Sequence, residues 1–280
     1  MRNHFFHSPR RWKDSISVGL AIFATVETFF AITNINLASC WGDWKWYEKL
    51  LCILLLFSFV VFIIFLLKNG KVKRGISINI NGITVNIKVG DIFKAKGWKI
   101  ISFNEYYDTI VDDIIIAHNT INGKFIDNYV SDINELNKTI QNTDTDINTN
   151  HKRFIKKSTK RTAFPLGRII VYKNEWMLLS FAHFDQNQVH LTQKDYEECL
   201  RIMWNEISRI YANRQINVPL LGSGIARFDD APNKSKSSLL KCMLCTLKNS
   251  RATINQPINI LLTKEVLEEL NIYELKHTLL

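Results

Sequence analysis

One stretch of the chain limits what it can fold into more than any other. Residues 50–67 read LLCILLLFSFVVFIIFLL, a run of 18 residues with one serine and no charge. As a helix, such a run extends about 27 Å, close to the thickness of the hydrocarbon core of a bilayer. A buried helix of a soluble protein is the alternative, but such a helix keeps a polar stripe. We therefore expect residues 50–67 to cross a membrane.

A second apolar stretch, residues 16–35, precedes the first and is interrupted by Glu27. A secretory signal peptide is the competing interpretation, because basic residues come before the stretch. The stretch is longer than the typical apolar core of a signal peptide, however, and no clear small-x-small cleavage site follows it. We expect residues 1–75 to form a hairpin of two transmembrane helices, and residues 76–280 to form a separate cytoplasmic domain.

Glu27 is the one ionisable side chain within the first predicted span. A charged group near the middle of a bilayer costs about 2.5–3.5 kcal/mol on insertion scales. We expect Glu27 to be protonated, to be paired, or to face water. A position that lines a pore or faces a second copy of the chain is the functional interpretation, and passive tolerance of the side chain is the alternative.

Most basic residues of the first 75 positions flank the two predicted helices on their outer sides. Four precede the first helix and four follow the second: Arg2, Arg10, Arg11, Lys13, Lys68, Lys71, Lys73 and Arg74. This placement predicts a multi-pass inner-membrane protein with both termini in the cytoplasm, where the basic residues meet anionic lipids. Residues 1–75 carry +6 of the net charge of +10, so the charge does not require a nucleic-acid partner.

The remaining chain alternates strand and helix patterns, which is typical of an α/β domain. Apolar alternation and turn signals predict strands at residues 76–80, 83–89, 98–103, 168–172, 176–184, 216–220 and 258–262. Helical periodicity predicts helices at residues 193–213 and 236–249, and a last helix from Lys264. Residues 108–118 form a helix or an ordered loop. Residues 127–162 are rich in Asn, Asp, Thr and Lys, which predicts an exposed, partly helical insertion.

A glycine-rich segment, PLLGSGIAR at residues 219–227, comes at the end of one predicted strand. Backbone N–H groups around Gly222, Ser223 and Gly224 can converge on an anion, and Arg227 can add positive charge. In parallel α/β sheets, ligands bind at the carboxyl ends of the strands, which is where this segment lies. The segment lacks the Lys-Ser/Thr pair of a P-loop. An ordinary tight turn is the alternative.

A second signal, Gly90-Asp91-Ile92, closes the strand predicted at residues 83–89. Alone it is compatible with a turn or with an aspartate that caps the next segment. Together with the glycine-rich segment and the α/β order, it resembles the macrodomain family, which binds ADP-ribose and related nucleotides. The resemblance implies a mixed sheet flanked by helices, with Asp91 and Ile92 at the adenine. It places the diphosphate at Gly222, Ser223, Gly224, Ile225 and Ala226.

Two further stretches make the resemblance more specific. ISFNEYYDTIVDD at residues 101–113 and INGKFI at residues 121–126 are similar to the macrodomain of membrane-anchored effectors in Thoeris-type bacterial antiphage systems. Hydrolytic macrodomains carry an Asn-Ala-Ala-Asn stretch at the distal ribose, which this chain lacks. Only Asn104 remains as a ribose contact, so the resemblance favours sensing over catalysis. Tyr106, Tyr107 and Asp108 either line the cleft or pack at the end of the strand.

The resemblance implies an antiphage effector. Its ligand would be an ADP-ribose-derived signal, such as histidine–ADP-ribose, made by a partner TIR-domain enzyme, with no other cofactor and no metal. Cys242 and Cys245 form a CxxC, but the second Cys/His pair that a zinc site needs does not accompany them. Binding of the signal would drive homo-oligomerisation and disrupt the membrane. The alternatives are a membrane-tethered ADP-ribosyl hydrolase and a docking domain that binds no nucleotide.

Overall fold

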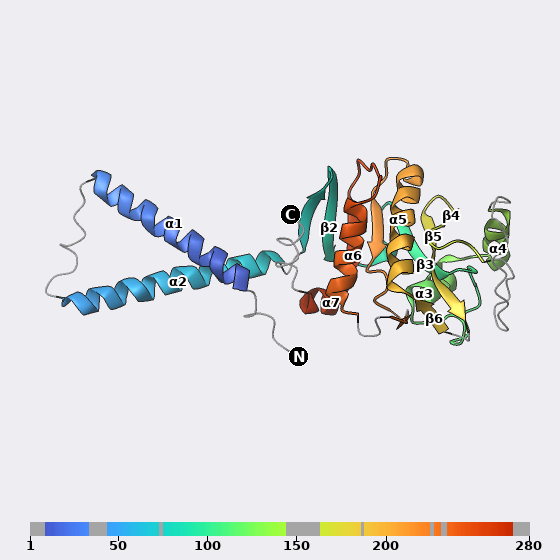
Figure 1. The fold of residues 1–280 in the computed structure, drawn as a ribbon, viewed down its shortest axis with the longest axis horizontal. Coiled ribbons are helices and arrows are strands. Elements are labelled where there is room, and N and C mark those ends of the chain that lie inside the picture. The colour runs from blue at the N-terminus through green and yellow to red at the C-terminus, as the bar shows by residue number, and fades with distance from the viewer. Residues whose placement is uncertain are drawn as a thin grey trace. The chain divides into compact units, whose positions relative to one another are not determined.

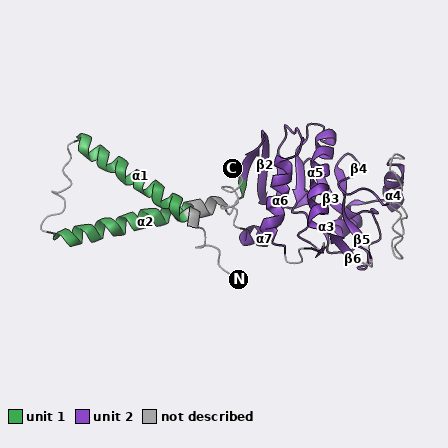
Figure 2. Ribbon diagram, viewed as in Figure 1, with its two compact units in different colours: residues 1–76, 271–278, 280 green, residues 77–270, 279 purple. Residues whose placement is uncertain are grey.

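The computed structural model describes residues 9–33, 44–72, 75–143, 163–185, 188–224, 227–230 and 234–270. These residues form two compact units, and the division falls between Ile76 and Ser77 (Figure 2). The first unit holds two long helices, and the second unit holds an α/β domain.

The first unit consists of α1 (Pro9–Thr33) and α2 (Trp46–Val72) (Figure 1). Both helices begin before the predicted apolar stretches, because polar residues at the flanks continue the helical turns. The ring of Trp12 stacks on that of Phe65, with 4.3 Å between the ring centroids. Gly19 permits a close approach of the two helices, since a Cβ there would meet a side-chain atom of α2 at 2.8 Å.

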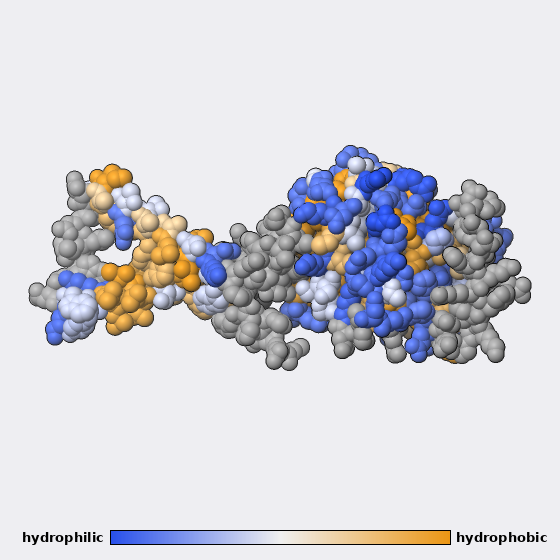
Figure 3. Space-filling model, in the orientation of Figure 1, coloured by the Kyte–Doolittle hydropathy of each residue, from blue (hydrophilic) through white to orange (hydrophobic). Residues whose placement is uncertain are grey.

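Both helices are long and apolar enough to cross a membrane. The spans Trp12–Thr33 and Trp46–Leu67 reach mean hydropathies of 1.8 and 3.4, and only 6% and 11% of their most apolar windows is buried within the structure. Figure 3 shows apolar surface along these helices, whereas the core helix of a soluble protein would be covered. Length, composition and exposure are thus compatible with a membrane hairpin.

Glu27 is exposed on α1 and has no hydrogen-bond or ion-pair partner among the residues that the structure describes. The neighbouring hydroxyl groups are used within the helix itself. Thr25 and Thr28 donate to the carbonyl oxygens of Ala21 and Ala24, both at 2.8 Å. The described part of the hairpin therefore supplies no partner for Glu27, and pairing was one of the three possibilities expected for it.

In the second unit, nine strands of the described chain form one mixed sheet. They are β1 (Ile76–Ile80), β2 (Ile83–Val89), β3 (Trp98–Asn104), β4 (Ile169–Tyr172), β5 (Trp176–Asp185), β6 (Gln188–Leu191), β7 (Ile216–Pro219), β8 (Arg227–Phe228) and β9 (Ile258–Leu262). The order is β1-β2-β9-β7-β3-β5-β6-β8, and β4 pairs with β5. The strands from β2 to β5 in this order are parallel to one another, whereas β4 and β6 are antiparallel to β5.

Helices surround the sheet. They are α3 (Ile121–Tyr129), α4 (Ile133–Asn142), α5 (Gln193–Ile210), α6 (Lys236–Lys248) and α7 (Lys264–Glu269), with a short 3-10 helix, η3 (Ile92–Lys94). The side chains of Thr120, Ser235 and Thr263 each accept a hydrogen bond from the amide three residues later. These N-caps fix where α3, α6 and α7 begin.

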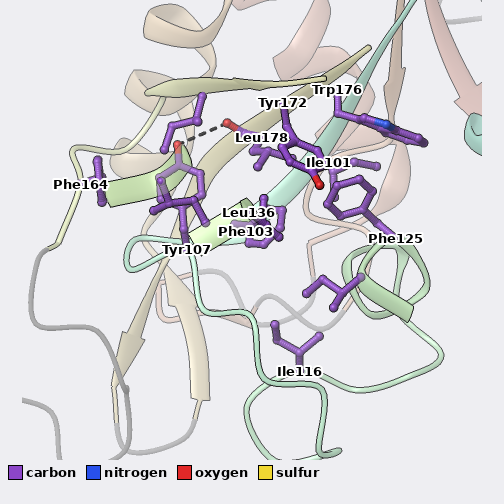
Figure 4. Packing of buried hydrophobic residues seen from close by; sticks show 13 residues of the cluster. Ile101, Phe103, Tyr107, Ile116, Phe125, Leu136, Phe164, Tyr172, Trp176 and Leu178 are labelled. Atoms are coloured by element: carbon purple, nitrogen blue, oxygen red, sulfur yellow. Dashed lines mark hydrogen bonds between the residues drawn. The ribbon is translucent and has the colours of Figure 1, made fainter. Parts of the chain in front are cut away.

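One hydrophobic cluster packs α3 and α4 against the sheet (Figure 4). Phe125 of α3 is fully buried, and its ring centroid lies 4.9 Å from that of Trp176 in β5. Leu136 and Ile140, one helical turn apart on α4, are buried in the same cluster. The insertion was predicted to be exposed and partly helical; α4 is helical and mostly exposed, but two apolar residues on one face dock it against the core. The insertion's remaining residues, 144–162, lie outside the described residues.

The other face of the sheet is covered by α5 and α6, which lie side by side (Figure 1). Strand side chains alternate between faces, so Met177 and Leu179 point away from the cluster that contains Leu178, and both are fully buried. On this side the ring centroid of Tyr196 in α5 lies 5.9 Å from that of Phe181 in β5. With both faces of the sheet covered, a ligand can reach the sheet only at the ends of its strands.

Candidate functional site

The carboxyl ends of the parallel strands carry the residues predicted to bind a ligand. Asn104 ends β3, Asp91 follows β2, and Gly222 follows β7. A cavity of about 630 Å³ opens at this edge. Its walls are the end of β3, the β5–β6 hairpin, the glycine loop (residues 219–224) and a second loop (residues 113–122) that leads into α3. The volume is that of a small-molecule site.

The glycine loop is a tight turn that requires glycine at one position. Gly222 has a φ of +80°, which L side chains rarely adopt. A Cβ at Gly222 would also meet Leu239 Cδ2 at 3.2 Å and Phe228 Cζ at 3.3 Å. The hydroxyl and the N–H of Ser223 both donate to the carbonyl oxygen of Leu220, at 2.6 and 3.3 Å. The side chain of Ser223 therefore shapes the turn.

Two amides of the glycine loop are open to a ligand. The N–H groups of Gly222 and Gly224 have no acceptor among the described residues, and Gly224 has open space where a Cβ would be. Such amides can bind an anion. Ile225 and Ala226, which were predicted to continue this site, lie outside the described residues, as does the side chain of Arg227. The backbone of Arg227 begins β8.

Asn104 lines the cavity, but its side-chain amide is already bonded. Nδ2 donates to Asp108 Oδ2 at 2.8 Å, and Oδ1 accepts from the backbone N–H groups of Tyr106 and Asp108 at 3.1 and 3.2 Å. Tyr106, Tyr107 and Asp108 are themselves buried and are not among the residues that line the cavity. Of the two interpretations, packing at the end of the strand is therefore the one that the structure supports. Asn104 can offer a ligand one further N–H at most.

Asp91 and Ile92 lie at the same edge of the sheet but outside this cavity. Asp91 Oδ1 accepts a hydrogen bond of 3.0 Å from Phe93 N and so caps η3, which is one of the alternatives that the sequence left open. Ile92 is buried. The Asp91 side chain is exposed, and its Oδ2 makes no hydrogen bond to any described residue. The structure therefore does not join Asp91 and Gly222 in one cavity.

The second loop forms a wall that sequence reasoning did not assign to the site. Asp112 Oδ1 accepts from the amides of Ile114 and Ile115 at 2.9 and 2.7 Å, and Asp113 Oδ1 accepts from His118 N at 3.0 Å. These bonds from backbone amides to side chains fix the shape of the loop, which has no regular secondary structure. The Asp-Asp pair was a local signal for a turn, but nothing local indicates that the turn borders a cavity.

The start of α3 completes this wall. Thr120 Oγ1 accepts from Gly123 N at 2.9 Å, and a Cβ at Gly123 would meet the carbonyl oxygen of Ala117 at 2.3 Å. Only glycine lets the helix begin so close to the loop. Asn122 lines the cavity, and its Oδ1 is buried without a hydrogen-bond partner among the described residues. An unbonded amide at the wall of a cavity is a candidate ligand contact, and the sequence analysis missed it.

The second loop is acidic. The carboxylate of Asp112 accepts hydrogen bonds from the amides of Ile115 and Ile114, and these bonds lower the pKa of Asp112. Asp113 is the one charged side chain among the described residues that line the cavity. Anion binding at the described walls therefore depends on backbone amides. No three described His, Cys, Asp or Glu side chains are grouped so that they could hold a metal ion.

Within the second loop, His118 forms a pair with a residue of α3. Its Nδ1 lies 2.7 Å from Asp127 Oδ2, and this hydrogen bond raises the pKa of His118 above its ordinary value. Both side chains are at least one-third exposed. The pair ties the loop to the helix that it precedes, and it can respond to pH.

Comparison with known proteins identifies the domain. The macro domain of Thoeris protein ThsA matches residues 85–263 of this chain. Thoeris protein ThsA from Bacillus amyloliquefaciens (strain Y2) is 35% identical over 278 residues, which cover 95% of this chain and 88% of that protein. Because so little of the chain is left out, the similarity must include most of α1 and α2 as well as the domain.

Solved macrodomains from Oceanobacillus iheyensis are similar at low sequence identity. The structure with MES bound is 16% identical, with a TM-score of 0.46, and covers 73% of this chain and 98% of that one. The structure with ADP is 17% identical, with a TM-score of 0.40, and covers 73% and 95%. The predicted macrodomain fold is confirmed by the family match and the mixed sheet between helices. The chain belongs to the Thoeris ThsA family of antiviral defence proteins.

Proposed function

We propose that this protein is an antiphage effector whose macrodomain senses an ADP-ribose-derived nucleotide, such as histidine–ADP-ribose, made by a partner TIR-domain enzyme. The observation that carries the proposal is the cavity between the glycine loop and the second loop, at the carboxyl edge of the sheet. Such edges are where open α/β sheets hold nucleotides. Membership of the Thoeris ThsA family supports the biological role.

The order of the predicted contacts along the sheet edge supports a ligand of this length. Asp91 follows β2, Gly222 follows β7 and Asn104 ends β3, and the sheet order is β2-β9-β7-β3. Strands lie about 4.8 Å apart, so the ends of β2 and β7, which Asp91 and Gly222 follow, are about 10 Å apart, and the end of β3 with Asn104 lies one strand further. Adenine, diphosphate and distal ribose follow one another in the same order in ADP-ribose. A ligand that extends along the edge would therefore reach all three, although Asp91 is outside the cavity itself.

Each assigned contact has a chemical reason. The open amides of Gly222 and Gly224 are donors for a doubly negative diphosphate, and we assign Ile225, Ala226 and Arg227 to the same group. The exposed Asp91 carboxylate, with Oδ2 unbonded among the described residues, can accept from the amino group of adenine, next to Ile92.

We propose that α1 and α2 form a hairpin in the inner membrane, with both termini and the macrodomain in the cytoplasm. The exposed apolar surface of both helices and the basic residues at their outer flanks support this arrangement. In water, so large an apolar surface would drive association. Glu27 would then face a water-filled path or another copy of the hairpin.

Ligand binding is proposed to shift the macrodomain towards self-association, which brings hairpins together and breaches the membrane. A shift from 1:99 to 99:1 requires about 5.5 kcal/mol of differential binding free energy. The second loop is the element proposed to respond. Ile116 supports this choice, because it lines the cavity and also belongs to the hydrophobic cluster of α3 and α4.

We propose binding without turnover. A tethered ADP-ribosyl hydrolase, the second candidate, would need a group that activates water in the cavity. Asp113 is the one acid among the described lining residues, and one of its oxygens is bonded to His118 N. The two candidates differ when full-length protein is incubated with ADP-ribosylated protein or with the nucleotide signal. Stable stoichiometric retention supports the sensor, and multiple turnover supports the hydrolase.

The proposal is tested by purifying the full-length protein from phage-infected cells that contain the TIR-domain enzyme. Mass spectrometry of the small molecules that co-purify should find an adenine nucleotide derived from ADP-ribose. The Gly222→Glu variant should carry none, because its carboxylate would occupy and repel the diphosphate site. Wild-type protein that carries no nucleotide while the TIR-domain enzyme is active would contradict the proposal and favour the docking domain.

A further inference from the structure

Lys234, two residues before α6, is a partly buried cation outside the assigned site. Its Nζ is buried and has no hydrogen-bond partner among the described residues. It lies over two aromatic rings, 4.3 Å from the ring centroid of Phe228 and 4.7 Å from that of Tyr196. The aromatic faces partly offset the loss of hydration of the ammonium group. Burial also lowers the pKa of Lys234.

The acidic residues near Lys234 are engaged elsewhere. Glu197 and Asp230 act on the ammonium through their charge, but neither forms an ion pair with it. Both carboxylate oxygens of Asp230 accept from Gln193 N, at 3.0 Å each, and Glu197 accepts from the side-chain amide of Gln193. The charge of Lys234 is therefore left without a paired anion in the described structure.

The two rings beneath Lys234 are also the support of the glycine loop. The hydroxyl of Tyr196 donates to the carbonyl oxygen of Leu221 at 3.0 Å. Edge atoms of the Phe228 ring lie 3.3 and 3.4 Å from the position of a Cβ on Gly222. One aromatic ring thus separates the ammonium group from the loop whose amides are open to an anion.

We infer that Lys234 is a fixed positive charge behind the anion site, acting on a bound diphosphate through the Phe228 and Tyr196 rings. The inference rests on the proposed function and deepens it, because it selects a nucleoside diphosphate over a neutral nucleoside. Among the described side chains at the cavity wall, the one charged group is the carboxylate of Asp113, so a described cation that favours an anion there acts from behind the loop. In this role Lys234 is a positioning residue that does not touch the ligand.

The inference is tested with the full-length protein in detergent and with two ligands. ADP-ribose carries the diphosphate, and adenosine carries the same base without charge. Calorimetry is run on wild type, Lys234→Met, Lys234→Arg and Lys236→Met at low and high salt. Lys236→Met is the matched control. It also removes one lysine charge, two residues from Lys234, but that charge pairs with Glu269 on the surface.

Lys234→Met should weaken ADP-ribose binding roughly tenfold, the effect of one unit charge at short range in a partly buried setting. It should leave adenosine binding unchanged and reduce the salt dependence of ADP-ribose binding. Lys234→Arg should keep most of the affinity, and Lys236→Met should resemble wild type. The melting temperature of Lys234→Met should stay close to that of wild type, because methionine removes a buried charge and keeps the apolar stem in place.

Two results would overturn the inference while the proposed function stands. One is equal weakening of ADP-ribose and adenosine by Lys234→Met, which would show a structural role. The other is unchanged ADP-ribose affinity and salt dependence in a folded variant. If wild type binds neither ligand, the proposed function itself is contradicted, and the inference falls with it.

Discussion

The hydroxyl group of Tyr196 donates a hydrogen bond of 3.0 Å to the carbonyl oxygen of Leu221, and this bond ties α5 to the glycine loop. Tyr196 is fully buried, and its burial raises the pKa of the phenol well above the ordinary value. The phenol therefore remains a neutral donor over the whole physiological pH range. Together with Phe228 against Gly222, the bond holds the loop against the core.

Tyr196→Phe should leave the carbonyl oxygen of Leu221 without this partner in a buried place. We expect a loss of about 1–3 kcal/mol in the free energy of unfolding, and weaker ADP-ribose binding because the loop is less well ordered. Urea denaturation and calorimetry measure the two effects. Tyr129→Phe is the control, since the Tyr129 side chain is 42% exposed. Unchanged stability and affinity in Tyr196→Phe would show that the bond does not support the loop.

The two glycines of the loop should respond differently to alanine. Gly222→Ala places a side chain at a φ of +80° against Leu239 and Phe228, whereas a Cβ at Gly224 has nothing within 4 Å. We expect Gly222→Ala to cost roughly 1–3 kcal/mol of stability and to weaken ADP-ribose binding at least tenfold. Gly224→Ala should change stability by less than about 0.5 kcal/mol. Equal effects at the two positions, measured by thermal unfolding and calorimetry, would contradict the geometry of the turn.

The pair of His118 and Asp127 predicts a dependence on pH. Because the hydrogen bond to Asp127 raises the pKa of His118, the protonated pair stabilises the fold fully below the ordinary histidine pKa of about 6.5. This contribution is lost as the pH rises through the raised pKa. NMR titration of His118 should show its pKa fall towards the ordinary value in Asp127→Asn. A pKa that does not change in the variant would show that the pair is absent in solution.

Glu27 predicts how the hairpin acts. If Glu27 lines a pore or faces a second copy, Glu27→Leu should reduce the permeabilisation of vesicles that the activated protein causes. Glu27→Gln should show a smaller reduction, because the amide keeps some hydrogen bonding. The matched control is Thr25→Val, whose hydroxyl is bonded within α1. Permeabilisation by Glu27→Leu equal to that of wild type would support passive tolerance of the side chain.

Most of the sheet could be predicted because the strands are short apolar runs between clear turn signals. The prediction for residues 258–262 agrees with β9, and the Asn81-Gly82 turn joins β1 and β2 with positive φ at both residues. The docking of α4 on the core was not predicted, because Leu136 and Ile140 are its only fully buried residues in a polar sequence. The two side chains are buried because they pack against the sheet. A local sequence pattern does not show that contact.

Part of the site was also predictable, because apolar strands are recognisable in the sequence. The sequence indicated that Gly222 and Asp91 both lie at the carboxyl edge, because each follows an apolar strand. It did not indicate that β9 would separate their strands, since strand order depends on long-range pairing. Residues 108–118 were predicted to be a helix or an ordered loop, but the place of the second loop at the cavity with the glycine loop was not predicted, because it exists only in the folded domain.

The central claim is that the cavity at the carboxyl edge of the sheet holds the diphosphate of an ADP-ribose-type nucleotide on the amides of the glycine loop. The most direct measurement is calorimetry of ADP-ribose binding to the full-length protein, wild type and Gly222→Glu. The account predicts one site per chain in wild type and no detectable binding in a folded Gly222→Glu variant. Binding of equal affinity in both proteins, or none in wild type, would contradict it.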